Sequence, residues 1–186
     1  MDAPQSSPPP SLVQPVQLYP DPIPGIIPFG TLTIVAGAPG VGKTAMFAEW
    51  IQRWRTGKTI NGKPTNAPPG GFYYIAADRQ WKSHQLWFDA VGYPDIPHYS
   101  LADDASYDLN KLKIPVNALD ALDHCLQKLS PPRGSHVGID PVSPLFIAGD
   151  ANRARDVAVS LLKISRLCQK HDINITGFAH FGKQKN

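Results

Sequence analysis

The segment GAPGVGKT, from Gly37 to Thr44, limits what this chain can fold into more than any other feature. It matches G-x-x-x-x-G-K-[ST], a pattern in which glycines let backbone N–H groups surround a phosphate at the positive end of the following helix. The pattern needs a buried strand before it and a helix after it. An apolar run at 32–36 and an unbroken helical stretch from 43 to about 55 meet both needs. The sequence therefore predicts a nucleotide-binding loop.

The positions of this loop have distinct expected roles. We expect Lys43 to contact the β and γ phosphates and the Thr44 hydroxyl to ligate Mg²⁺, so ATP and Mg²⁺ are the expected cofactors. The predicted nucleotide-binding residues are Gly37, Ala38, Pro39, Gly40, Val41, Gly42, Lys43, Thr44 and Ala45. A fortuitous glycine-rich turn would not explain why a strand, the loop and a helix follow in this order.

The rest of the chain alternates strand and helix patterns. Apolar runs at 72–77, 136–140 and 173–180 predict further buried strands, and 79–92, 114–130 and 152–172 predict helices. The segment 93–108 is expected to be irregular. Strands that alternate with helices predict an α/β fold with a largely parallel sheet and helices on both faces.

Composition sets the domain organisation and the compartment. Nine of the twenty prolines fall in the first 28 residues, which predicts a Pro-rich disordered arm at 1–18 before one globular domain at 19–186. No apolar run approaches the ~18 residues that cross a bilayer, and the start lacks a basic or apolar leader. We therefore expect a cytoplasmic protein without a membrane partner, in which Cys125 and Cys168 are buried free thiols.

The net charge of +3 is unevenly distributed along the chain. From Ser130 onward, eight Lys and Arg residues stand against four Asp residues. A basic C-terminal part is compatible with contact with nucleic-acid phosphates and equally with a solvated helix, and the count does not choose between them.

Two aspartates follow buried strands and are candidates for the chemistry. Asp140 ends the strand 136–140, where it could bind Mg²⁺ together with Thr44; a helix cap or turn is the alternative. Many ATPases place a glutamate directly after this aspartate, but here the next residue is Pro141, and the one glutamate of the chain, Glu49, lies in the helix after the loop. Asp78, which follows the strand 72–77, is the candidate base that orients water, and a cap for the following helix is its alternative.

These motifs together resemble a known family. The loop GAPGVGKT, the strand end YYIAADR, the segment VGIDPVSPLF and the final GFAHFGKQKN are similar to the RecA-like P-loop ATPase core of hexameric replicative helicases, RecA and RadA recombinases and KaiC proteins. The nearest likeness is to the plasmid RepA-type hexameric replicative helicases. The resemblance covers about 26 to 185 and makes 19–186 a RecA-like ATPase domain.

The resemblance also implies roles for particular residues. Its catalytic set falls on Lys43, Asp78 and His180, where Asp78 replaces the usual glutamate and His180 is the γ-phosphate sensor. Lys183 and Lys185 fall where such rings offer basic residues to the neighbouring subunit's nucleotide, and solvated lysines are the alternative. The family continues with further strands, a DNA-binding loop and an arginine finger, so the expectation is a partial sequence or a reduced member that works with partners.

Three functions remain in competition at this point. The leading one is a Mg²⁺-dependent ATPase that forms a hexameric ring and moves on single-stranded DNA during replication. The second is a non-motor nucleotide-binding module with a regulatory or loading role. The third, a small-molecule phosphotransferase, needs an arginine-bearing lid, and no such segment stands out.

Overall fold

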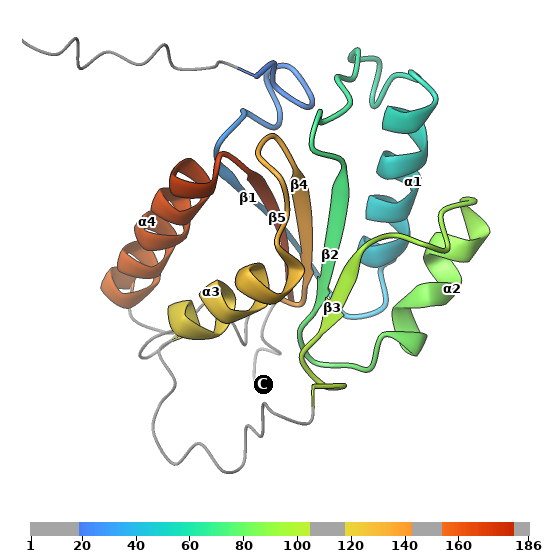
Figure 1. The fold of residues 1–186 in the computed structure, drawn as a ribbon. Coiled ribbons are helices and arrows are strands. Elements are labelled where there is room, and N and C mark those ends of the chain that lie inside the picture. The colour runs from blue at the N-terminus through green and yellow to red at the C-terminus, as the bar shows by residue number, and fades with distance from the viewer. Residues whose placement is uncertain (1–18, 105–117, 143–153, 181–186) are drawn as a thin grey trace, which may run out of the picture.

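The computed structural model describes residues 19–104, 118–142 and 154–180. Strands and helices alternate through most of this length (Figure 1). In chain order the elements are β1 (Leu32–Gly37), α1 (Lys43–Arg55), β2 (Phe72–Ala76), α2 (Lys82–Ala90), β3 (His98–Ser100), α3 (Ala118–Leu129), β4 (His136–Asp140), α4 (Ala154–His171) and β5 (Asn174–His180).

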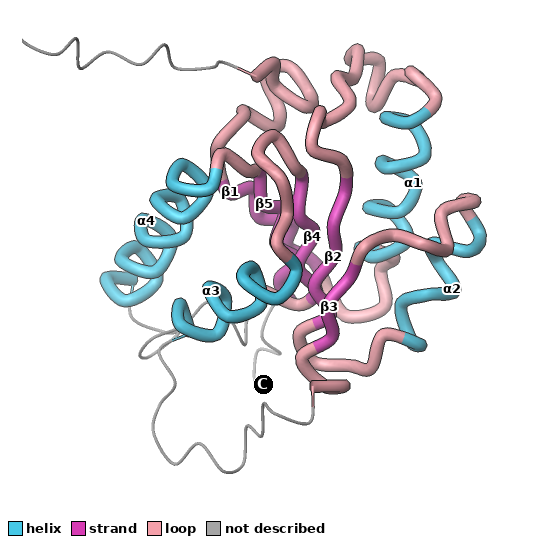
Figure 2. Tube along the Cα trace, in the orientation of Figure 1, coloured by secondary structure: helices cyan, strands magenta, loops and turns pink. Residues whose placement is uncertain are grey.

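The strands form one parallel sheet in the order β1-β5-β4-β2-β3 (Figure 2). Gly37 at the end of β1 pairs with His180 at the end of β5, and Ala76 of β2 pairs with Asp140 of β4. The carboxyl ends of all these strands therefore meet at one edge of the sheet. The expected α/β fold, with a largely parallel sheet, is confirmed.

Helices cover both faces of the sheet: α1 and α2 lie on one face, and α3 and α4 on the other (Figure 1). The alternation of side chains along β2 explains how one strand serves two cores. Tyr74 and Ala76 pack with the first pair of helices, whereas Ile75 packs with the second. Both cysteines are buried and free, as expected, and each lies in a helix of the second face.

Helix α1 is held close to the middle of the sheet by one aromatic side chain. Phe47 is fully buried, and a Cβ atom built on Gly138 of β4 would lie 2.3 Å from its ring. Because only glycine leaves room there, the first turns of α1 approach the strand that ends at Asp140. This contact sets the distance between the two halves of the site described below.

The segment that precedes β1 packs onto the other end of α1. Ile23 and Ile27 are fully buried, and the indole Nε1 of Trp54 donates a hydrogen bond to the carbonyl of Pro22 at 2.9 Å. The expected arm at 1–18 lies outside the described residues, so the division between arm and domain stays a prediction.

One expectation about the segments after β2 was wrong. The stretch expected to be irregular contains β3, which pairs with β2 from Tyr74 to Ala76. A strand of three residues without an apolar run has no distinct pattern, and its pairing with a neighbouring strand decides its conformation. Trp87 on α2 is 47% exposed. No helix among the described residues is long and apolar enough to cross a membrane.

The core of the first face contains a fully buried histidine. His136 of β4 contacts the rings of Phe47, Trp54 and Phe72, and its Nε2 lies 2.8 Å from the hydroxyl of Thr176 on β5. Burial in these apolar surroundings lowers the pKa of His136 to about 3. The imidazole therefore stays neutral in the folded protein across the range in which an unfolded histidine becomes charged.

We predict that this histidine makes the fold sensitive to acid. Below pH ~6.5 the unfolded chain binds a proton at this position that the folded chain does not bind until about pH 3, so the free energy of unfolding falls as the pH decreases between these values. The expected slope from this one group is up to about 1.4 kcal/mol per pH unit. Urea unfolding of the wild type and of His136→Gln between pH 4 and pH 7 tests it. Equal slopes in the two proteins would contradict the prediction.

Candidate nucleotide-binding site

The phosphate-binding motif forms the turn between β1 and α1. Gly40 and Gly42 have φ angles of 78° and 86°, a conformation that side chains with a Cβ adopt only with strain, so glycine is required in this turn. Lys43 is only 8% exposed, and its Nζ donates to the carbonyls of Gly37 and Ala38 at 3.0 and 2.9 Å. The lysine thus lies across its own loop, at the N-terminus of α1, where an anion is favoured.

The second residue of α1 reaches the end of β4. The Thr44 hydroxyl donates a hydrogen bond to Oδ2 of Asp140, which is 96 residues away in the sequence. The backbone of Asp140 is fixed as well, because its carbonyl accepts a hydrogen bond from the N–H of Ala77 at 3.0 Å. The structure therefore brings together the two residues that were expected to hold magnesium.

These residues open onto a cavity of about 250 Å³ at the carboxyl edge of the sheet. The residues lining the cavity come from the loop, from the segment after β2, from α2 and from β4: Pro39, Gly40, Gly42, Lys43, Thr44, Ala45, Asp78, Arg79, His84, Trp87 and Asp140. The candidate base Asp78 thus lines the same cavity as the loop and Asp140. Its carboxylate is 36% exposed and lies 4.0 Å from Nε of Arg79, whose side chain is 70% exposed.

Two buried polar side chains behind Asp140 were missed by sequence reasoning. The Tyr74 hydroxyl donates to Oδ2 of Asp140 at 3.2 Å and lies 3.0 Å from Nδ1 of His84. In the sequence, Tyr74 is indistinguishable from other aromatic residues of a buried strand, and His84 is one polar residue in an amphipathic helix. Neither position carries a signal that could have identified the contact.

Burial shifts the pKa of both side chains in the direction of the neutral form. Burial, and then the charge and hydrogen bond of Asp140, raises the pKa of Tyr74 well above its usual value. Burial also lowers the pKa of His84, against the opposing effect of the carboxylates of Asp140 and Asp78. At neutral pH the phenol therefore keeps its proton, and the imidazole is uncharged.

The remaining expected site residues are described only in part. His180 ends β5 beside Gly37, so its backbone lies next to the start of the phosphate loop, but its side chain is outside the described residues. Lys183 and Lys185 also lie outside them. The roles of these three residues stay predictions.

The oxygen atoms at the site suit magnesium. A hydroxyl that donates its hydrogen to Asp140, as Thr44 does, keeps its lone pairs for a cation. The described residues contain no cluster of three or more His, Cys, Asp or Glu side chains that would form a complete protein cage. Mg²⁺ is held in proteins by one or two oxygen side chains together with phosphate oxygens and water, so the residues present fit this ion when it arrives with a nucleotide.

The fold and the site are those of a RecA-like P-loop nucleotide-binding domain: a parallel sheet covered on both faces, with the phosphate loop after β1 and an aspartate at the end of β4, two strands away in the sheet. Residues 15–186 match the model of the AAA domain family, and the chain belongs to that family. Among solved structures it is similar to a KaiC-like protein from the hyperthermophilic archaeon Pyrococcus horikoshii, with 14% identity and a TM-score of 0.50 over 90% of this chain and 70% of that chain. No curated protein matches the sequence significantly.

We predict that Lys43→Ala weakens nucleotide binding. A hydrogen bond to a charged group contributes about 1.5 to 3 kcal/mol, so the dissociation constant of ATP should rise roughly tenfold to a hundredfold. Fluorescence titration with a labelled ATP analogue measures the change. Lys58→Ala removes the same charge from an exposed position outside the cavity and should leave the affinity unchanged. Equal affinities in wild type and Lys43→Ala would contradict this site.

Proposed function

We propose that this protein hydrolyses ATP with Mg²⁺ and uses the energy as a helicase-type motor on single-stranded DNA in replication. The observation that supports hydrolysis most directly is the presence of Asp78, Asp140 and the phosphate loop around one cavity. Asp140 ends β4, and Asp78 lies two residues past the end of β2, the strand that pairs directly with β4. The proposal places the protein in the cytoplasm.

Each group of the cavity has a role in this proposal. Bound magnesium would neutralise charge on the β and γ phosphates. The loop amides and Lys43 bind the phosphates, and Thr44 and Asp140 supply oxygen ligands. Asp78 orients the attacking water, and its partial exposure keeps it accessible to that water. His180 senses the γ phosphate from the strand that lies between β1 and β4.

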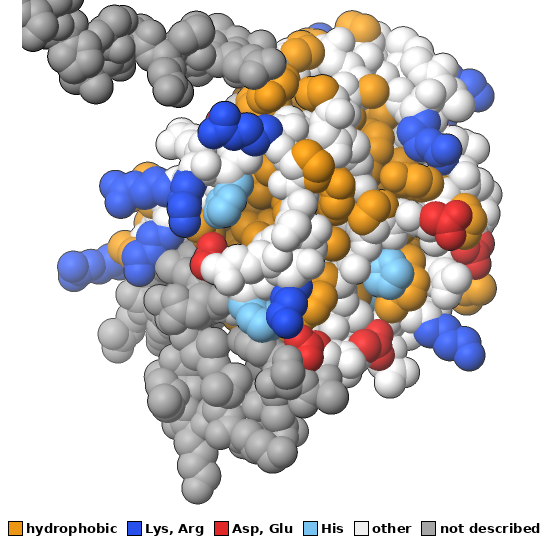
Figure 3. Space-filling view, viewed as in Figure 1, with side chains coloured by type: hydrophobic (Ala, Val, Ile, Leu, Met, Phe, Trp, Pro, Cys, Tyr) orange, Lys and Arg blue, Asp and Glu red, His pale blue; other side chains and the backbone are white. Residues whose placement is uncertain are grey.

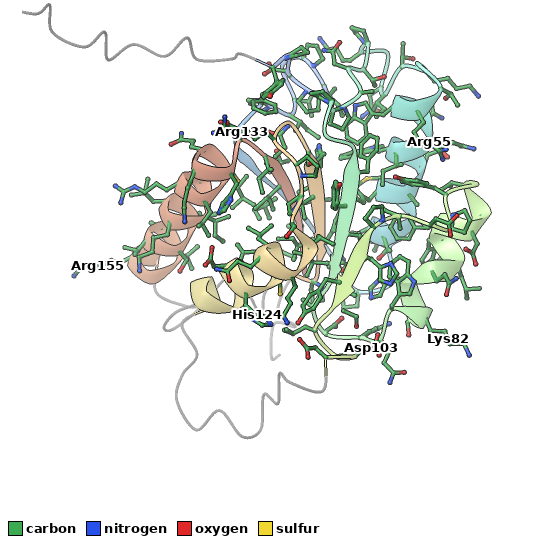
Figure 4. The ribbon with its side chains drawn as sticks, viewed as in Figure 1. Arg55, Lys82, Asp103, His124, Arg133 and Arg155 are labelled. Carbon is green, nitrogen blue, oxygen red and sulfur yellow. The ribbon has the colours of Figure 1, made fainter. Side chains whose placement is uncertain are left out.

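Two surface features favour a nucleic-acid partner. Helix α4 presents the exposed basic side chains Arg155, Lys163, Arg166 and Lys170. Lys and Arg side chains gather over this helix in Figure 3, and Figure 4 shows Arg155 pointing away from the body of the protein. Phosphate contacts of this kind supply sequence-independent affinity.

An exposed aromatic ring adds to this argument. All four tryptophans lie in the described residues, and Trp87 is the exposed one. Trp87 lines the cavity, where a base could stack on its ring and where bound DNA would lie close to the nucleotide. In the proposal a hexameric ring of identical subunits surrounds the strand, with Lys183 and Lys185 directed to the neighbouring subunit's nucleotide.

We predict that wild-type protein shows Mg²⁺-dependent ATP turnover that single-stranded DNA stimulates. Asp78→Asn should lower turnover at least about a hundredfold, because it removes the group that positions and polarises water, while ATP binding persists. Asp89→Asn makes the same change at an exposed position of α2 outside the cavity and should be neutral. Steady-state phosphate release with and without DNA is the measurement.

Each alternative has its own outcome in this experiment. ATP turnover that single-stranded DNA does not change, in a protein that stays monomeric on gel filtration with ATP and DNA, would contradict the proposed motor function. ATP binding without turnover would favour the non-motor regulatory or loading module. Full turnover in Asp78→Asn would remove Asp78 from the role of base.

A further inference from the structure

The side chains of His84, Tyr74 and Asp140 form a series of hydrogen bonds with one consistent direction of donation. The Tyr74 hydroxyl donates its hydrogen to Oδ2 of Asp140 at 3.2 Å. Because its one hydrogen is used there, the hydroxyl accepts from His84, so the imidazole carries a proton on Nδ1. The direction of donation runs from His84 to Tyr74 to Asp140, and it follows from the network of contacts.

Packing holds this chain of hydrogen bonds in place. The ring of Tyr74 is fully buried, and its centroid lies 4.9 Å from that of Phe88 and 5.9 Å from that of Trp81. The Nδ1–H of His84 donates to the hydroxyl oxygen of Tyr74, which leaves the hydroxyl hydrogen directed toward Asp140. The position of the donor therefore depends on α2 as well as on β2.

The same oxygen of Asp140 accepts hydrogen bonds from two different elements. Thr44 reaches Oδ2 from α1, and Tyr74 reaches it from β2. Two donors on one oxygen restrict the rotation of the carboxylate. Thr44 is itself a proposed ligand of the cation, whereas Tyr74 is not. Tyr74 is therefore the donor that holds the Asp140 carboxylate without binding the cation.

We propose that Tyr74 is a positioning residue for the Asp140 carboxylate, that His84 holds Tyr74 in this role, and that the pair sets the affinity of the site for a divalent cation. This inference rests on the proposed function, because it assigns metal binding to Asp140. It differs from a purely structural role for a buried tyrosine in one measurable way: removal of the hydroxyl weakens cation binding while metal-free nucleotide binding by the loop persists.

The His84 side chain has a further feature that fits this role. Its Nε2 is buried and has no hydrogen-bond partner among the described residues. A buried nitrogen without a hydrogen-bond partner costs the folded protein stability. The hydrogen bond from Nδ1 to Tyr74 gives the imidazole a function in the site.

The test uses Mn²⁺, which electron paramagnetic resonance detects, as a probe for the cation. Mn²⁺ is titrated into the full chain at saturating ADP, and labelled ADP is titrated separately in EDTA. Partners of this kind typically change metal affinity tenfold or more, so Tyr74→Phe should weaken Mn²⁺ binding about tenfold and leave ADP affinity in EDTA within about twofold. Tyr73→Phe removes a hydroxyl from the adjacent residue, which faces the opposite core, and should change neither value.

Variants of His84 provide the second arm. His84→Leu should weaken Mn²⁺ binding as Tyr74→Phe does, because the Tyr74 hydroxyl is no longer held. His84→Asn places an amide close to the position of Nδ1 and should recover part of the affinity, whereas His84→Gln places it near Nε2 and should recover less. Thermal unfolding of each variant identifies any protein that fails to fold, and ADP affinity in EDTA shows that the loop is intact.

The outcomes separate this inference from the proposed function. Unchanged Mn²⁺ affinity in Tyr74→Phe, with nucleotide and Mn²⁺ bound by the wild type, overturns the positioning role alone. An equal loss of Mn²⁺ affinity and of metal-free ADP affinity also overturns it, because the tyrosine is then structural. A wild type that binds no nucleotide with or without cation overturns the proposed function and this inference together.

Discussion

The parallel alignment of the strands is the constraint on which the site depends. Because β1, β5, β4 and β2 run in one direction, the residues that follow or end them meet at a single edge of the sheet. Strand β5 separates the phosphate loop from the end of β4, so the pairing of strands cannot by itself join them. Helix α1 closes that gap: Phe47 packs over Gly138, and Thr44 then reaches Asp140. The site is thus a consequence of helix packing onto a correctly ordered sheet.

Buried polar groups show how the same core serves both stability and chemistry. His136 and His84 both lie buried on the first face of the sheet. His136 contacts the Thr176 hydroxyl of β5 and does not line the cavity. Its main consequence is therefore a lower free energy of unfolding at acidic pH. His84 leads through Tyr74 to Asp140 and lines the cavity. A buried histidine is therefore informative about function only through the group that its nitrogen contacts.

Sequence reasoning succeeded where a local pattern carries the physical cause. The phosphate loop needs glycine at the positive-φ positions Gly40 and Gly42, and these glycines are part of the motif. The buried strands β1, β2, β4 and β5 are continuous apolar segments of the sequence. The expectation that Asp78 and Asp140 lie near the loop followed from the rule that parallel strands end at one edge, and the structure brings them together. It failed for β3, because three residues hold no periodicity and pairing with β2 decides their conformation. It could not find the contact between Tyr74 and His84, since ten residues and a turn separate them and only tertiary packing aligns their polar atoms.

The particular aspartate at position 78 bears on how such a site would work. A carboxylate on a shorter side chain than glutamate lies farther from the phosphates, and here it shares the cavity with the exposed cation of Arg79. In phosphoryl transfer the protein contributes chiefly position and charge, so a water held between such a carboxylate and the γ phosphate can be oriented without close approach of the side chain. The demand for accurate geometry then shifts to the cation and its ligands. A carboxylate at Asp140 that is restrained by two donors, Thr44 and Tyr74, is suited to meet that demand.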